Sequence, residues 1–156
     1  MPKITPFLWF EKEAEAAAKL YTTIFKNSKI LKVNYFFEDP HGRKASTVEF
    51  EIDGQRVIAL NGGPHFKQTE AFSFVIDCAD QAEVDYYWDK FLSSGGKASQ
   101  CGWLKDQFGV SWQVTPRILI ELNTSPNREA AQRAWQAMLK MTKIDIAALK
   151  KAFDRI

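Results

Sequence analysis

The sequence predicts an α+β fold built from two copies of one strand-helix-strand unit, followed by C-terminal helices. Three observations support this. The order of one strand, one helix and further strands occurs twice, each copy ends on a strand after a glycine-bearing turn, and helical spacing dominates after Pro116. A chain of 156 residues has the size of one domain and is long enough to bury most of its apolar surface. We therefore expect a single domain made of two βαβββ modules.

The first module is expected over residues 3–63 and the second over residues 71–116, with residues 64–70 as the linker. In the first module an apolar run precedes a segment with helical spacing, and alternating runs follow. Asp53-Gly54 separates the last two runs, and an Asp-Gly pair in this place is a strong hairpin signal. The expected strand, helix and three strands lie at residues 4–10, 11–25, 30–38, 46–52 and 56–61.

The second module repeats this order of elements. An apolar strand leads into the helical segment AEVDYYWDKFL, and Gly95-Gly96 then provides a turn before the last strands. The expected strands lie at residues 72–78, 98–104 and 110–115. Because both copies contain the same elements in the same order, we expect them to fold alike.

Residues 125–156 are expected to form a helical extension. Ser125 and Pro126 have the residue types of a helix N-cap and first helical position, and apolar residues follow at helical spacing. A second helix is expected to begin near Asp145 and to run to the C-terminus, with Ile144 and Leu149 placed as a hydrophobic staple. These helices either pack on the core or cover a partner subunit.

The composition excludes several classes of protein. With 46% hydrophobic and 26% charged residues, the chain has the profile of a folded protein rather than a disordered one. Its 21 basic and 19 acidic residues give a net charge of +2, which indicates no attraction to nucleic acid or to an anionic membrane. No apolar run is long enough to span a membrane, and no signal-peptide pattern is present. We expect a cytoplasmic protein without nucleic-acid or membrane partners.

The cysteines and histidines are few. Cys78 and Cys101 are expected as small core residues rather than a disulfide, because secreted disulfide frameworks use more cysteines. Cys101 as a nucleophile would need a neighbouring base, so core or cavity lining is expected instead. His41 and His65 lie in an expected turn and in the linker, where surface positions are common. His65 remains the alternative candidate for proton transfer.

Five segments carry a resemblance to a known family. They are PFLWF, AAKLYTTIF, VIALNGGP, FSFVIDCADQAEVDYYWDKF and the run CGWLKDQFGVSWQVTP at residues 101–116. In these the chain resembles the PhnB-like branch of the glyoxalase, bleomycin-resistance and dioxygenase superfamily, also called vicinal oxygen chelate proteins. The resemblance implies a glyoxalase/bleomycin-resistance-like fold, in which curled mixed sheets of two modules surround a cavity, and a homodimer.

Some members of that branch carry an older label as 3-demethylubiquinone-9 3-methyltransferases. A methyltransferase that uses S-adenosylmethionine is expected to have a parallel-sheet pattern and a glycine-rich turn after its first strand. This chain has neither pattern. Methyl transfer is therefore disfavoured.

The resemblance also provides a test for a metal site. Metalloenzymes of the superfamily bind a divalent ion through side chains on the first and last strands of each module. The corresponding positions here are Pro6, Leu60, Ser73 and Gln113. A single amide oxygen does not hold a hard cation without charged ligands. We therefore expect no metal ion and no other cofactor.

The same strands predict the lining of a ligand cavity, because residues two apart on a strand share a face. The expected lining residues are Leu8, Ile58, Leu60, Ser73, Val75, Cys101, Trp103, Ser111 and Gln113. Apolar side chains predominate among them, with two hydroxyls and one amide. Such a lining suits a small, largely apolar molecule held by one or two hydrogen bonds.

Three functions remain open at this point. The first, which the lining favours, is a metal-free module that binds a small molecule. The second is an enzyme of the lyase, isomerase or dioxygenase type, which would need groups from elsewhere, such as His65 with Glu49 or Glu51. Those two carboxylates alternate with the buried face of their strand, so a solvated face is expected for them. The third is a protein-interaction module that uses the C-terminal helices.

Overall fold

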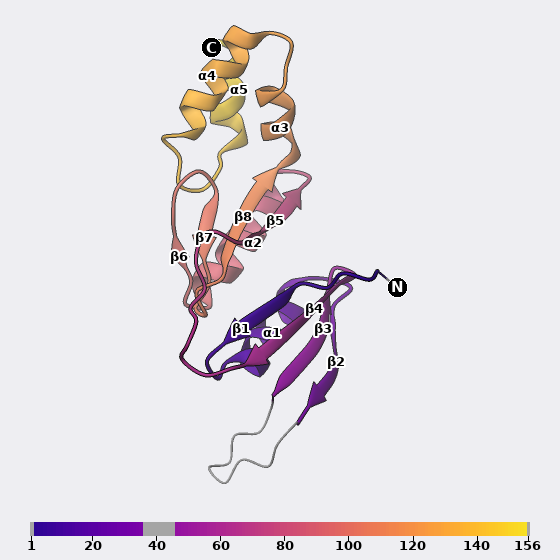
Figure 1. Cartoon of the computed structure of the whole chain (residues 1–156). Helices are drawn as coiled ribbons and strands as arrows, with labels where there is room; N and C mark the ends of the chain where they lie inside the picture. The colour runs from indigo at the N-terminus through magenta and orange to yellow at the C-terminus, as the bar shows by residue number, and fades with distance from the viewer. Residues whose placement is uncertain (1, 36–45, 156) are drawn as a thin grey trace. The chain divides into compact units, whose positions relative to one another are not determined.

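A computed structural model describes residues 2–35 and 46–155 of the chain. The predicted turn at residues 40–42, with His41, lies outside the described residues. The chain divides into two compact units, Met1–Gln68 and Thr69–Ile156, and the boundary falls in the predicted linker. Figure 1 shows that each unit contains a strand, a helix and further strands, and that helices follow in the second unit. The predicted α+β class is confirmed.

The first unit is a mixed four-stranded sheet with a helix on one face. Its elements are β1 (Phe7–Phe10), α1 (Ala14–Ile24), β2 (Lys29–Asn34), β3 (Thr47–Ile52) and β4 (Gln55–Asn61). The strand order is β1-β4-β3-β2, with β1 parallel to β4 and the other pairs antiparallel. Asp53 and Gly54 have φ angles of 48° and 79°, as a tight hairpin turn between β3 and β4 requires.

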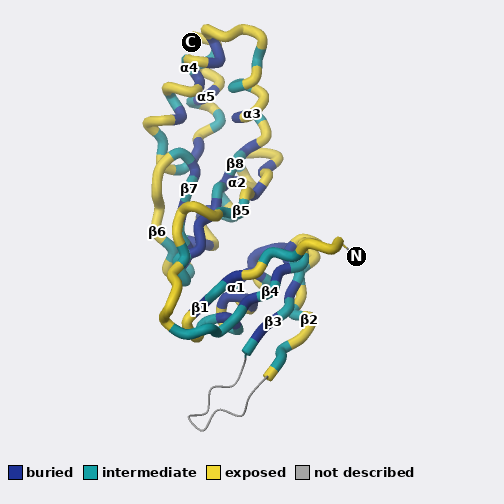
Figure 2. Tube along the Cα trace, viewed as in Figure 1, coloured by how far each residue is buried: buried dark blue, intermediate teal, exposed yellow. Residues whose placement is uncertain are grey.

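Alternation along the strands determines which face of this sheet α1 covers. Every second residue of β3 is fully or nearly buried, and α1 presents small alanines together with Tyr21 to that face. The rings of Tyr21 and Phe50 lie 6.1 Å apart. Figure 2 shows the strongly buried positions concentrated in α1 and the sheet residues that it covers. The apolar core of the first unit therefore lies between the helix and one sheet face.

The second unit repeats this arrangement. Its first elements are β5 (Ser73–Cys78), α2 (Gln81–Ser93), β6 (Lys97–Ala98), β7 (Trp103–Lys105) and β8 (Ser111–Pro116). The strand order is β5-β8-β7-β6, with β5 parallel to β8. Asp80 caps α2, because its side chain accepts a hydrogen bond from the backbone N–H of Glu83. Phe91 of α2 packs on Trp112 of β8, with 4.7 Å between the ring centroids.

In the part of the chain that the structure describes, three helices follow β8: α3 (Arg117–Asn123), α4 (Arg128–Met138) and α5 (Ile146–Asp154). The first of them was not expected. It continues from the last residue of β8, and no side chain caps its first turn, so it lacks the usual start signal. None of the described helices is long and apolar enough to cross a membrane.

The starts of α4 and α5 test the expected caps. The predicted N-cap at Ser125 is wrong, because Asn127 caps α4 and its side chain accepts a hydrogen bond from Ala130 N at 3.2 Å. Asn is as good an N-cap as Ser, and Asn127 directly precedes the helix. The predicted staple is confirmed, since Ile144 and Leu149 are both fully buried in one apolar cluster.

Side-chain hydrogen bonds attach the helical extension to α2. The side chain of Gln81, in the first turn of α2, donates to the carbonyl of Ile144 at 3.0 Å and accepts from Ile146 N at 2.9 Å. Lys143 adds an ion pair with Asp85, at 2.8 Å. The start of α5 is therefore held against the start of α2.

Backbone hydrogen bonds attach the extension to the turn before β7 as well. The N–H groups of Cys101 and Gly102 donate to the carbonyls of Met141 and Thr142, both at 2.8 Å. Gly102 has a φ of 82°, and a Cβ there would lie 2.9 Å from a carbonyl oxygen of β8. A glycine is thus required where the extension meets the sheet.

Candidate functional site

The sheet face that α2 leaves uncovered is the candidate ligand surface of the second unit. Trp103 pairs with Gln113, and Gln113 pairs with Val75, so these three side chains form one row across β7, β8 and β5. The next row contains Lys105, Ser111 and Ser73. Val75 is 59% exposed, whereas Trp103 and Gln113 are half-buried, so the row is most open at β5. The structure thus places five of the predicted lining residues on one face.

Polar groups on this face are only partly engaged. Gln113 Nε2 donates to Ser73 Oγ at 2.9 Å. Ser111 Oγ is buried, and no described residue forms a hydrogen bond with it. Lys105 forms an ion pair with Glu70, and this pairing lowers the pKa of the Glu70 carboxyl. The face therefore combines apolar surface with an amide and a hydroxyl group, while its one lysine is paired.

Cys101, a further predicted lining residue, does not lie on this face. It occupies the turn before β7 with a φ of 58°, and it packs against the buried cluster of the helical extension that includes Leu119 and Met138. Of the two expected positions, core and cavity lining, the structure therefore gives Cys101 the first, in the core of the extension. Cys78 is buried in the core as predicted, and burial raises the pKa of its thiol to about 12.

The first unit also has an uncovered face, opposite α1. Phe7 pairs with Ile58 and Trp9 pairs with Leu60, so these four side chains lie together on that face. Phe7 is 54% exposed. Trp9 is held in place, because its indole N–H donates to Gly63 O at 3.0 Å and its ring packs edge to face on Phe66.

The prediction that Leu8 shares a face with Ile58 and Leu60 is wrong. Leu8 pairs with Ala59 on the face that α1 covers and is only 3% exposed. The error is a one-residue slip in the expected register of β1, and a slip of one residue moves every side chain to the other face. Phe7 and Trp9 take the place that Leu8 was expected to hold.

A polar network on the same face was missed by sequence reasoning. Glu49 pairs with Ile58 across β3 and β4, which places its carboxylate among the apolar side chains of this face. The carboxylate accepts hydrogen bonds from Arg56 and from Asn34 Nδ2, the latter at 3.2 Å. Both bonds lower the pKa of Glu49. The strict alternation of β3 contained this signal, since it put Glu49 opposite the buried face.

These contacts bear on the enzyme alternative. A carboxylate that is engaged by Arg56 is a weak base, because the pairing stabilises its ionised form. His65 is exposed in the segment after β4. No group of three His, Cys, Asp or Glu residues that could hold a metal ion occurs in residues 2–35 and 46–155.

The donor set on the two open faces does not fit a divalent metal ion. The described outward residues of the first and last strands are Phe7, Trp9, Arg56, Ile58, Leu60, Ser73, Val75, Asp77, Ser111, Gln113 and Thr115. Asp77 is the one carboxylate among them and pairs with Arg117, whereas hard cations require several charged or carbonyl oxygens. The side chains at these positions supply hydrogen bonds and apolar contact instead.

Residues 2–115 match the family model described as 3-demethylubiquinone-9 3-methyltransferase. The chain belongs to this family. A solved structure described as a putative 3-demethylubiquinone-9 3-methyltransferase, PhnB protein, from Bacillus cereus is 30% identical, with a TM-score of 0.66. The similarity covers 74% of this chain and 99% of that one. The search of curated proteins found no match.

Two more distant structures share the fold. Protein PA1353 from Pseudomonas aeruginosa is 16% identical with a TM-score of 0.60, and the match covers 72% of this chain and 95% of PA1353. A fosfomycin resistance protein, FosX, from Listeria monocytogenes is 15% identical with a TM-score of 0.51, and the match covers 72% of this chain and 89% of FosX. The fold is that of the glyoxalase, or vicinal oxygen chelate, superfamily.

The fold lacks the features expected of a methyltransferase that uses S-adenosylmethionine. Each described sheet contains one parallel pair and two antiparallel pairs, and no glycine follows β1 before α1 begins. Folds that bind a nucleotide cofactor at a glycine-rich turn place it at the carboxyl edge of a parallel sheet. Family membership therefore gives the PhnB-like fold, and methyl transfer finds no support in it.

Proposed function

We propose that this PhnB-like protein binds a small, largely apolar molecule on its uncovered sheet faces, without a metal ion. The observation that supports this most is the open row of Trp103, Gln113 and Val75. Val75 is 59% exposed and lies beside the ring of Trp103 and the amide of Gln113. Small-molecule sites combine apolar and aromatic side chains with a few polar groups in this way. A ligand there would gain apolar contact and a fixed hydrogen bond.

The polar groups of these faces favour a neutral ligand. On the face of the second unit, the outward charged side chains of β5 and β7 are paired, Asp77 with Arg117 and Lys105 with Glu70. Gln113 remains to orient the ligand through its amide oxygen.

A titration with the fluorescent apolar probe N-phenyl-1-naphthylamine tests this proposal. We expect Val75→Asp to weaken probe binding about tenfold, because the new carboxylate must be desolvated. Ile120→Asp is the matched control, since Ile120 is 57% exposed on α3, away from the sheet. Equal probe affinity in Val75→Asp and the wild type would overturn the proposal.

Metal analysis separates this proposal from the enzyme alternative. The wild type is dialysed against a chelator, and its metal content and probe affinity are measured before and after. We expect the probe affinity to be unchanged and no divalent ion to remain. One tightly held ion per chain, with probe binding lost on its removal, would favour metal-dependent chemistry.

A homodimer and a cytoplasmic location are also part of the proposal. The apolar side chains on the open faces, such as Phe7 and Val75, would be shielded in a dimer. Sedimentation equilibrium measures the mass of the assembly, and a monomer at micromolar concentration would contradict the dimer.

A further inference from the structure

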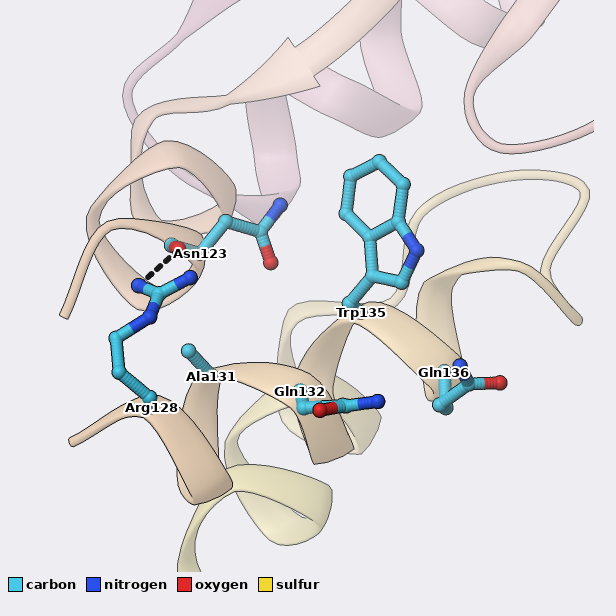
Figure 3. A pocket seen from close by; sticks show the side chains of 6 residues that line it. All are labelled: Asn123, Arg128, Ala131, Gln132, Trp135 and Gln136. Carbon is cyan, nitrogen blue, oxygen red and sulfur yellow. Dashed lines mark hydrogen bonds between the residues drawn. The ribbon is translucent and has the colours of Figure 1, made fainter.

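The helical extension carries a pocket of its own between α3 and α4. Its volume is about 320 Å³, and it is lined by Asn123, Arg128, Ala131, Gln132, Trp135 and Gln136. Figure 3 shows the guanidinium of Arg128 and the amide of Asn123 at one end and the indole of Trp135 at the other. This volume lies at the lower end of the range of small-molecule sites, roughly 300–1,000 Å³. The pocket lies wholly outside residues 2–115, the segment that matches the family.

We propose that this pocket binds a small aromatic carboxylate that carries a ring N–H. The site is independent of the sheet faces described above. Three features of the pocket each specify one part of that ligand: a free edge of the Arg128 guanidinium, the exposed indole of Trp135, and the buried amide oxygen of Asn123.

The guanidinium of Arg128 is fixed with one edge unused. Its Nη1 donates to the carbonyls of Asn123 and Ser125, both at 3.0 Å. No described residue accepts a hydrogen bond from Nε or Nη2 of Arg128. The Nε and Nη2 groups form the edge that binds a carboxylate through two parallel hydrogen bonds. Among the described lining residues Arg128 alone is charged, so no carboxylate of the lining competes for that edge.

Trp135 provides the aromatic surface. It stands on α4, is 46% exposed, and lines the pocket with its indole. An indole left open to water beside a cation and amides offers a face for stacking, and stacked aromatic pairs add to the gain from area burial. The ligand is therefore expected to be planar and aromatic.

Asn123 provides the third requirement. Its Oδ1 is buried, and no described residue donates a hydrogen bond to it. Figure 3 shows the amide directed into the space between α3 and α4. A buried acceptor without a donor is unfavourable, and a ligand N–H would satisfy it. A hydrogen-bond donor on the ligand therefore distinguishes the expected compound from a plain aromatic acid.

The test uses three probes with the full chain labelled with ¹⁵N. Indole-3-carboxylate has all three features, benzothiophene-3-carboxylate lacks the N–H, and indole lacks the carboxylate. The indole N–H signal of Trp135, assigned by its loss in Trp135→Phe, is followed in heteronuclear correlation spectra. We expect a saturable shift with indole-3-carboxylate and about tenfold weaker binding of either other probe. Indole loses the hydrogen bonds to the charged Arg128, and benzothiophene-3-carboxylate leaves the buried acceptor of Asn123 without a donor.

Variants identify the residues responsible. Arg128→Lys keeps the charge but loses the two-pronged edge, and Asn123→Ala removes the acceptor; each should weaken indole-3-carboxylate binding about tenfold or more. Leu139→Ala is the control, because Leu139 directly follows α4, is 43% exposed and does not line the pocket. Val75→Asp on the sheet face should bind this probe as the wild type does, which keeps the test separate from the proposed function.

Three results would overturn the inference. They are equal affinities for the three probes, wild-type affinity in both Arg128→Lys and Asn123→Ala, and a saturable shift that appears at Trp103 rather than Trp135. If Asn123→Ala lowers the melting temperature, the comparison of probes on the wild type still decides the matter.

Discussion

Asp106 is a buried carboxylate that holds the end of the second sheet together. It is 5% exposed, and its Oδ1 accepts hydrogen bonds from the N–H groups of Phe108 and Val110, at 2.8 and 3.0 Å. Its Oδ2 accepts from the indole N–H of Trp112 at 2.9 Å. One side chain therefore closes the turn before β8 and also positions the large core residue of that strand.

Asp106→Asn should destabilise the second unit by about 3 kcal/mol. The amide keeps one oxygen for the turn but places an N–H₂ group opposite the indole N–H, so a hydrogen bond to a charged group is lost, which contributes about 1.5–3 kcal/mol. The two turn bonds also weaken when the acceptor loses its charge. The Trp112 indole N–H would be left buried without an acceptor.

Hydrogen exchange read by mass spectrometry measures this change, because peptides of β8 report on the second unit separately from the first. Asp77→Asn is the matched control: Asp77 pairs with Arg117 at 2.8 Å, but both side chains are 61% exposed. An exposed pair contributes about 1 kcal/mol or less. If Asp106→Asn changes the exchange of β8 no more than Asp77→Asn does, the role assigned to Asp106 is incorrect.

Three further predictions follow from single contacts. Because Arg56 lowers the pKa of Glu49, their network stabilises the fold at pH values above the usual Glu pKa of 4.5, and this stabilisation is lost as the pH falls through the lowered pKa. In Glu49→Gln the melting temperature should therefore depend less on pH in the acid range, and an unchanged pH dependence would contradict this. With its thiol pKa raised to about 12, Cys78 should resist iodoacetamide at mildly alkaline pH until the protein unfolds, and peptide mass spectrometry would reveal early labelling that contradicts this. Gly96→Ala should destabilise by about 1–3 kcal/mol, since its Cβ would lie 2.6 Å from Phe91 O, and an unaltered melting temperature would argue against that clash.

Local patterns were sufficient for most of the fold. The alternation in β3 and the Asp53-Gly54 turn depend on neighbours in the chain, so they predict strands and a hairpin directly. The short strand β1 has four residues, and over so few positions an apolar run does not fix which residues face the helix. That is why Leu8 was assigned to the wrong face.

The candidate site was less accessible to sequence reasoning. Ser73, Val75 and Gln113 follow from alternation alone, whereas Cys101 depends on a left-handed turn and on a contact with residues 119–149, far along the chain. The pocket between α3 and α4 was also beyond prediction. Its shape depends on how two helices pack, and no local spacing reports that.

The attachment of the helical extension changes how a truncation of this protein must be interpreted. Removing residues 125–156 would take away two hydrogen-bond partners of Gln81 and those of the Cys101 and Gly102 N–H groups, and would open the cluster around Ile144. If the shortened chain loses an activity or a partner, the cause can be damage to the second sheet as well as the absence of the helices themselves. Point substitutions at exposed positions of α4 avoid this ambiguity, and the segment common to the family is best studied inside the full chain.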